Sequence, residues 1–166
     1  MHAPITQQHL HAEALYDDDY VVVAGKQSSW ARRRRMDLAD LMNEPWALPP
    51  PDSGLGSIFL QAFLARGLDY PRVAVSTQTM PARAAVAATG RFLSIVPGSA
   101  LKLSPGKPAL KALPIDLPTT RRPTGILTFK NRTPSPATQL FIDCARDVAK
   151  QLAKPPAVRR RSRSPL

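Results

Sequence analysis

The fold is decided by the stretch VAVSTQTMPARAAVAATGRFLSIV at residues 73–96, which predicts a strand, a turn, a helix and a second strand in that order. Val73–Val75 is a short valine-bearing strand, and a threonine-rich turn leads from it to Pro81, a residue well suited to the first helical position. An alanine-rich helix follows and is expected to stop at Gly90. Residues 92–96 then return as a strand.

Two strands and one helix are predicted before this unit. The run YVVVA at residues 20–24 is apolar throughout and rich in valine, which is typical of a strand covered on both faces. Residues 46–48 (WAL) predict a shorter strand, after which Asp52 and Ser53 offer N-cap side chains to a helix that ends near Gly67. This order predicts an α/β domain with a largely parallel sheet and right-handed crossovers.

The pattern is looser after Pro97. Residues 110–117 are predicted to be extended, residues 125–129 (GILTF) to form a strand, and Ser135-Pro136 to open a last helix. That helix carries an apolar stripe of Leu140, Phe141, Cys144, Val148 and Leu152. We expect Cys144 on this stripe to be buried and inert. Residues 155–166 read as a disordered basic tail because they lack any apolar period.

Composition limits the class of protein. The chain has 166 residues and a formal net charge of +11, but the excess is concentrated in Arg32–Arg35, in Arg121-Arg122 and in the last eight positions. A single cysteine excludes an intrachain disulfide and favours a reducing compartment. The sequence shows neither a signal-peptide pattern nor a long apolar run, so we expect a cytoplasmic protein without a membrane partner.

Two polar segments are candidate ligand-binding loops. Residues 76–81 follow a strand and open a helix, a place where α/β proteins bind ligands and where helix N-termini favour anions. The loop at residues 50–57 precedes the other helix and could present backbone N–H groups in the same way. The alternative is that Thr77 or Thr79, and Asp52 or Ser53, only cap the two helices. From the residues alone, the two interpretations of the 50–57 loop are equally good.

Other polar groups point to no chemistry. His9 and His11 have no further ligands at metal spacing, so no metal is assigned, and no cofactor motif is found. Asp17–Asp19 are expected to form a solvated loop rather than an acid and base pair, and Arg32–Arg35 a solvated basic loop. The sequence therefore predicts that this protein is not an enzyme.

Several phrases, in this order, resemble the effector-binding (substrate-binding) domain of LysR-type transcriptional regulators. They are AEALYDDDYVVVAG at 12–25, DLADLMNEPWALPPPDSG at 37–54, AFLARGLDYPRVAVST at 62–77, VAATGRFLSIVPGS at 86–99 and LTFKNRTPSPATQLFIDCARDVAKQLA at 127–153. The resemblance implies a fold like the type 2 periplasmic binding proteins, in which two α/β subdomains hold a ligand in the cleft between them.

The resemblance also implies a division of the chain. Residues 1–24 would be the end of subdomain I and a crossing strand, residues 25–123 a complete subdomain II, and residues 124–154 the return strand and C-terminal helix of subdomain I. The helix-turn-helix, the linker helix and the first strands of subdomain I have no counterpart in the sequence. We therefore expect a truncated regulator that binds no specific DNA by itself.

In this family both candidate loops line the effector cleft. The resemblance thus favours ligand contact over simple capping, and the predicted ligand-binding residues are Pro51, Asp52, Ser53, Gly54, Thr77, Gln78 and Thr79. The expected partner is a small-molecule effector, with a carboxylate favoured although Asp52 leaves the charge open, and a homo-oligomer is compatible with it. The alternatives are a basic polyanion-binding protein, a solute-binding transport protein of the same fold, or a gene remnant without function.

Overall fold

The computed structural model describes residues 9–103 and 109–153, and the chain divides into two compact units. One unit comprises Asp18–Arg122, and the other is formed by the segments before and after it. The predicted boundary at 123/124 lies next to this division, whereas the one at 24/25 lies about seven residues after it. The assignment of these segments to subdomains I and II stays a prediction. The predicted tail at residues 155–166 lies outside the described residues.

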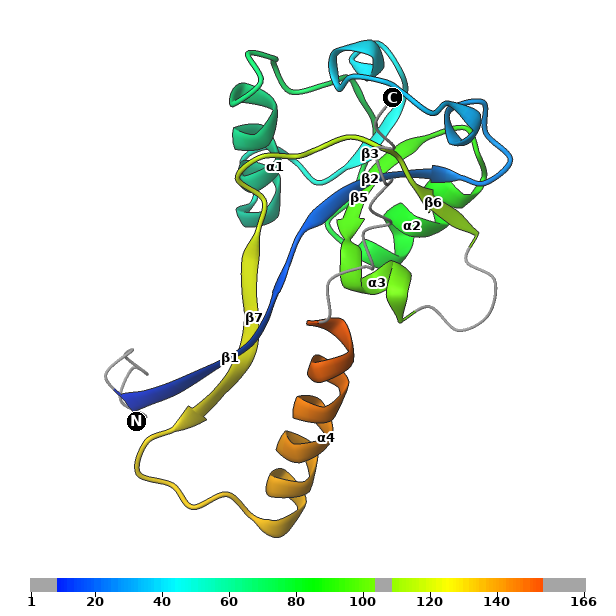
Figure 1. The fold of residues 1–166 in the computed structure, drawn as a ribbon. Coiled ribbons are helices and arrows are strands. Elements are labelled where there is room, and N and C mark those ends of the chain that lie inside the picture. Colours follow the sequence, from blue (N-terminus) through cyan, green and yellow to red (C-terminus); the bar gives the residue numbers. More distant parts are fainter. Residues whose placement is uncertain (1–8, 104–108, 154–166) are drawn as a thin grey trace, which may run out of the picture. The chain divides into compact units, whose positions relative to one another are not determined.

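A five-stranded sheet with the order β4-β3-β5-β2-β6 forms the centre of the Asp18–Arg122 unit (Figure 1). Its strands are β2 (Tyr20–Gly25), β3 (Trp46–Leu48), β4 (Val73–Ser76), β5 (Leu93–Pro97) and β6 (Leu110–Ala112). β3 is parallel to both β4 and β5, whereas β2 runs antiparallel to β5 and β6. The strands of the strand-helix-strand pattern, β3, β4 and β5, are parallel as predicted. The expectation of a largely parallel sheet is wrong, because both pairings of β2 are antiparallel and the sheet is mixed.

In the described residues of this unit, two longer helices and three shorter helical segments lie between the strands. α1 (Gly54–Leu64) joins β3 to β4, and α2 (Met80–Ala88) joins β4 to β5. The predicted stops are confirmed, because Gly67 and Gly90 follow these helices with φ of 70° and 78°, values that favour glycine. The short segments are η2 (Trp30–Arg32), η3 (Ala39–Leu41) and α3 (Gly98–Lys102), and the residues after β6 up to Leu117 are mostly irregular.

The core lies on both faces of the sheet, as the valine run predicted. Val22 and Ala24 of β2 pack in one cluster with Phe59 and Phe63 of α1, whereas Val23 packs in a second cluster with Ala87 of α2. Successive side chains of a strand point to opposite faces, so α1 and α2 cover opposite sides of β2. The prediction that residues 20–24 are covered on both faces is confirmed.

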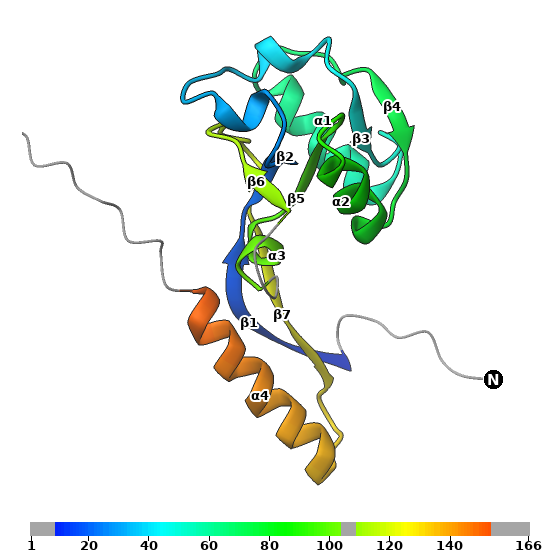
Figure 2. The same ribbon diagram turned by 90° about the vertical axis from the view of Figure 1, so that its right-hand side faces the viewer.

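The other unit contains a two-stranded ribbon and one helix. β1 (Leu10–Asp18) pairs with β7 (Arg122–Phe129), and α4 (Pro136–Leu152) runs beside the ribbon (Figures 1 and 2). The predicted start of α4 is confirmed, because the side chain of Ser135 accepts a hydrogen bond from the amide of Thr138. Nε and Nη2 of Arg146 donate to the two carboxylate oxygens of Glu13 in β1, at 2.9 and 2.8 Å. This ion pair lowers the pKa of Glu13 and raises the pKa of Arg146.

α4 turns a different face to the ribbon from the one expected. Of the predicted stripe only Leu152 is buried, and it lies with Ile142 and Ala149, which the stripe did not include. Leu140 and Phe141 of the stripe are 67% and 69% exposed. The expectation that Cys144 is buried is wrong, since the thiol is exposed. Arg146 lies on the same face of α4 as Ile142 and Ala149, and its ion pair with Glu13 holds that face toward β1.

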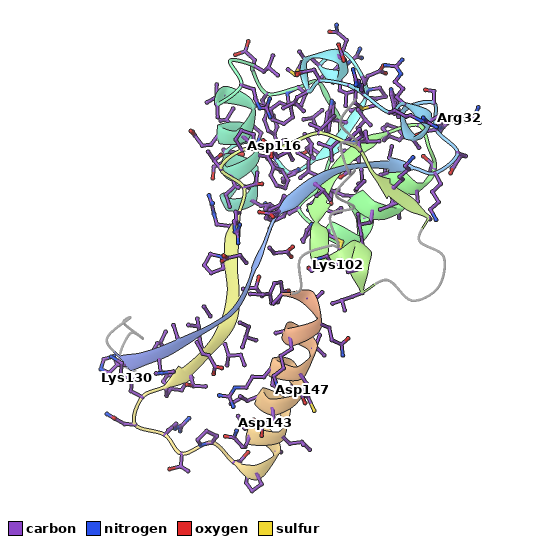
Figure 3. All side chains as sticks on the ribbon, viewed as in Figure 1. Arg32, Lys102, Asp116, Lys130, Asp143 and Asp147 are labelled. Carbon is purple, nitrogen blue, oxygen red and sulfur yellow. The ribbon has the colours of Figure 1, made fainter. Side chains whose placement is uncertain are left out.

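The expectation of a solvated loop for the three consecutive aspartates is also wrong. β1 extends through Asp18, and the carboxylate of Asp18 accepts hydrogen bonds from the backbone amide and the hydroxyl of Ser99. The basic run at Arg32–Arg35 is exposed as expected, and Figure 3 labels Arg32 at its start.

Phe63→Ala is expected to lower the free energy of unfolding of the Asp18–Arg122 unit by about 3–5 kcal/mol, because it leaves a cavity in the core. Phe63 is fully buried and packs edge to face on Trp46 and Tyr70. Urea denaturation measures the loss. Leu64→Ala, on the same helix at a side chain 47% exposed, is the control and should change stability by about 0.5 kcal/mol or less. Equal losses in the two variants would contradict the assigned core.

Candidate functional site

The two predicted ligand loops leave the sheet at the same edge. β3 and β4 are parallel neighbours, and their last residues, Leu48 and Ser76, are partners in the ladder. The loop before α1 and the turn before α2 therefore start side by side. The amide of Thr77 donates to the carbonyl oxygen of Leu48 at 3.1 Å, which ties the second segment to the end of the first. The structure thus brings residues 51–54 and residues 77–79 to one edge.

Ser53 shapes the loop before α1. Its backbone amide and its hydroxyl both donate to the carbonyl oxygen of Pro50, at 3.0 and 2.7 Å, and its Oγ accepts from the amide of Gly56 at 3.0 Å. Ser53 is therefore the N-cap of α1, as one of the two sequence interpretations predicted, and Asp52 is not. Pro51, Asp52 and Gly54 are exposed, and Ser53 is partly buried.

The turn before α2 is organised differently. Thr79 occupies the N-cap position of α2, but its side chain makes no capping hydrogen bond. The hydroxyl oxygens of Thr77 and Thr79 lie 3.3 Å apart, and the amide of Thr79 donates to Oγ1 of Thr77 at 3.4 Å. Gln78 and Thr79 are exposed, and Thr77 is partly buried. Capping of α2 therefore does not account for these two hydroxyls, and their role as ligand contacts stays a prediction.

Two further side chains at these loops, the partly buried Tyr70 and the buried Arg83, were not predicted from the sequence. The hydroxyl of Tyr70 donates to the carbonyl oxygen of Pro49 at 2.9 Å, which fixes the start of the first loop. Arg83 is 0% exposed, and its Nη1 donates to the carbonyl oxygens of Thr77 and Gln78 at 3.3 and 2.7 Å. No sequence signal marks either residue, because a tyrosine in a loop and an arginine in an alanine-rich helix are ordinary.

Burial governs the ionisation of these groups. It raises the pKa of Tyr70 to about 12, with an opposing contribution from nearby Arg83, and it also raises the pKa of Tyr20. Burial lowers the pKa of Arg83, while the neighbouring Tyr20 and Tyr70 raise it. An arginine stays protonated over the physiological range. A cation therefore lies behind the second loop.

The edge offers backbone donors and hydroxyls rather than a catalytic set. Within the described ranges, 9–103 and 109–153, no three His, Cys, Asp or Glu side chains are grouped so that they could hold a metal ion. In the same ranges no helix is long and apolar enough to cross a membrane.

A hollow of about 260 Å³ lies elsewhere in the Asp18–Arg122 unit and is lined by apolar side chains from α2, β5, α3 and β6. No local sequence pattern predicts this hollow, because its lining comes from four separate segments.

The comparisons with known proteins define the class. The family model described as the LysR substrate binding domain matches residues 1–150. The chain belongs to this family, whose members are the effector-binding domains of LysR-type transcriptional regulators. It is a regulatory family and not an enzyme family. The expected fold, like that of the periplasmic binding proteins, is confirmed.

Solved structures share this fold at low sequence identity. The regulatory domain of CcmR from Synechocystis PCC6803, in complex with 2-PG, is 21% identical, with a TM-score of 0.67, 90% of this chain covered and 72% of that one. The effector-binding domain of QuiR in complex with shikimate is 21% identical, with a TM-score of 0.58 and coverage of 91% and 68%. For HinK from Pseudomonas aeruginosa, a LysR family regulator, the values are 17%, 0.66, 92% and 53%. The chain thus spans about half of that regulator.

Gly56→Ala is expected to destabilise the loop before α1, because an added Cβ would lie 1.8 Å from the carbonyl oxygen of Pro50. Backbone must shift to admit it, at a cost of about 1–3 kcal/mol or more in the free energy of unfolding. Gly54→Ala is the matched control, since nothing lies within 4 Å of its added Cβ. Thermal and urea unfolding should separate the two variants. A Gly54→Ala variant as unstable as Gly56→Ala would contradict the loop geometry.

Tyr70 is expected to make stability fall as the pH rises from about 10 to about 12. The pKa of Tyr70 is raised from 10.0 to about 12, so in this window the unfolded chain releases the phenol proton while the folded chain retains it. The contribution of the protonated Tyr70 phenol to the free energy of unfolding is fully present below about pH 10 and is lost as the pH rises to about 12. Urea unfolding of Tyr70→Phe should show a shallower decline than the parent, with a remainder from Tyr20. An unchanged slope in Tyr70→Phe would refute the assignment.

Proposed function

We propose that the chain senses a small-molecule effector at the edge where β3 and β4 end, and that it catalyses no reaction. The observation that carries the proposal is the hydrogen bond from Thr77 to Leu48, which fixes two polar helix starts side by side. The proposed contacts come from the first loop and the second turn: Pro51, Asp52, Ser53, Gly54, Thr77, Gln78 and Thr79. Ligands of α/β proteins commonly bind beyond the carboxyl ends of strands, which is where these residues lie.

The favoured effector is a small organic acid. The first N–H groups of an α-helix have no acceptor within the helix, and the helix dipole attracts negative charge there. α1 and α2 both begin at this edge. Two structures of the same fold hold small molecules, 2-PG in the CcmR domain and shikimate in the QuiR domain. The exposed carboxylate of Asp52 would oppose an anion placed directly on the first loop, so the carboxylate of the effector is assigned to the second turn.

Binding would act by shifting a pre-existing conformational equilibrium, which is how a sensing domain passes on a signal without chemistry. We also propose a cytoplasmic location, because the family serves transcription, and a homo-oligomeric state. By itself the 166-residue chain is proposed to recognise no operator sequence. The basic runs would at most give weak, salt-sensitive contact with polyanions.

The proposal predicts saturable binding of at least one member of a library of small organic acids that includes shikimate, measured by calorimetry on the 166-residue chain. A double variant, Thr77→Val with Thr79→Val, keeps the side-chain shape but removes both hydroxyls, and it should weaken binding about tenfold or more. Thr89→Val is the control, since the hydroxyl of Thr89 lies at the other end of α2 and donates to Val86.

Two outcomes would count against the proposal. One is the absence of any saturable binding at residues 51–54 and 77–79. The other is tight DNA binding that weakens steeply with salt and is abolished by deleting residues 157–166, which would favour a polyanion-binding protein instead.

A further inference from the structure

Arg83 lies one turn into α2. It is the only charged side chain among the buried core residues of the described ranges. The residues around it in α2 are mostly alanine, so nothing in the helix itself requires a cation there. Burying an unneutralised charge is costly, and proteins retain such groups where they hold a structure or bind a ligand.

The hydrogen bonds of Arg83 leave its charge without a counter-ion in the described part of the chain. Nη1 donates to two backbone carbonyl oxygens, those of Thr77 and Gln78, and Nε is buried without any hydrogen-bond partner. No carboxylate of the described residues forms an ion pair with it. The acidic groups that act on the pKa of Arg83 are the phenols of Tyr20 and Tyr70. Both phenols are neutral at physiological pH, so neither supplies a negative charge there. The guanidinium therefore projects an uncompensated positive charge onto the turn.

The same hydrogen bonds orient the turn. In a trans peptide unit the C=O and N–H groups point in opposite directions. Because the carbonyl oxygens of Thr77 and Gln78 face Arg83, the amides of the same two units, those of Gln78 and Thr79, face away from it. The amide of Thr79 has only a long bond, 3.4 Å, to Oγ1 of Thr77. The turn thus presents donors on one side and has a buried cation on the other, an arrangement that favours an anion.

We propose that Arg83 is a positioning residue that makes the turn at residues 77–79 select an anionic effector over a neutral one. The effector touches the turn, and Arg83 acts from behind it through the two peptide units and through its charge. This inference rests on the proposed function and adds its charge selectivity. The rival is that Arg83 only holds the turn in shape.

The test uses acetate and acetamide, which differ in charge but hardly in size, at constant ionic strength. The probes are titrated into the isotopically labelled 166-residue chain while the amide resonances are followed by NMR. The amides of Gln78 and Thr79 should shift saturably with acetate and much less with acetamide. Equal responses to the two probes, or no response of either amide, would overturn the inference.

Variants at Arg83 separate charge from shape. Arg83→Met should weaken the acetate response about tenfold or more. Arg83→Lys keeps the charge but not the paired donor geometry, so it should retain a preference for acetate over acetamide, whereas a purely structural role predicts that both variants lose it equally. Arg91→Met, at an exposed arginine after α2, is the control and should leave the response unchanged. If Arg83→Met fails to fold, Arg83→Lys and the two probes on the parent still decide.

Failure of the proposed role of Arg83 can be told apart from failure of the proposed sensing function. If a neutral library compound binds at residues 51–54 and 77–79 as tightly as its acid, the sensing role stands and the role of Arg83 falls. If shifts of the two amides by acetate occur while no library compound binds there, the anion preference stands and the sensing role falls.

Discussion

The site depends on the complete burial of β3 between two parallel neighbours. Trp46, Ala47 and Leu48 have no exposed surface, and the indole N–H of Trp46 is satisfied by the carbonyl oxygen of Leu41 at 2.8 Å. Pairing with β4 and β5 then fixes where β3 ends. Because parallel strands end at the same edge, the loops to α1 and α2 have to start next to each other. A slip in this register would separate the two halves of the proposed site.

Backbone groups, held by a few side chains, build most of this edge. The hydroxyl of Ser53 closes the first loop, and Tyr70 fixes the carbonyl of Pro49 beneath it. Arg83 does the same for the second turn from inside the protein. Such a site needs no reactive side chain, which agrees with membership of a regulatory family whose function is to bind. Specificity would then come from the orientation of amides and from a buried charge.

The charge of the chain is distributed in a way that its total conceals. The formal net charge of +11 invites a polyanion partner, yet the arginines at positions 32–35 are exposed and solvated. Arg83, by contrast, is buried and donates hydrogen bonds to the turn at residues 77–79. Asp143 and Asp147 lie along α4 (Figure 3). They form ion pairs with Arg146 and Lys150 of the same helix. These exposed pairs contribute little to stability.

The sequence by itself determined the local elements of this protein. The strands were predicted by valine runs. The helices were predicted by serine caps at Ser53 and Ser135 and by glycine stops at Gly67 and Gly90, because these signals act over a few residues. It also predicted the family and the two loops. Only the tertiary structure decided the direction of β2 and the face that α4 buries. It also decided the exposure of Cys144, the burial of Arg83 and the partial burial of Tyr70. Each of these depends on which distant segment lies opposite a residue, and a one-dimensional pattern contains no such information.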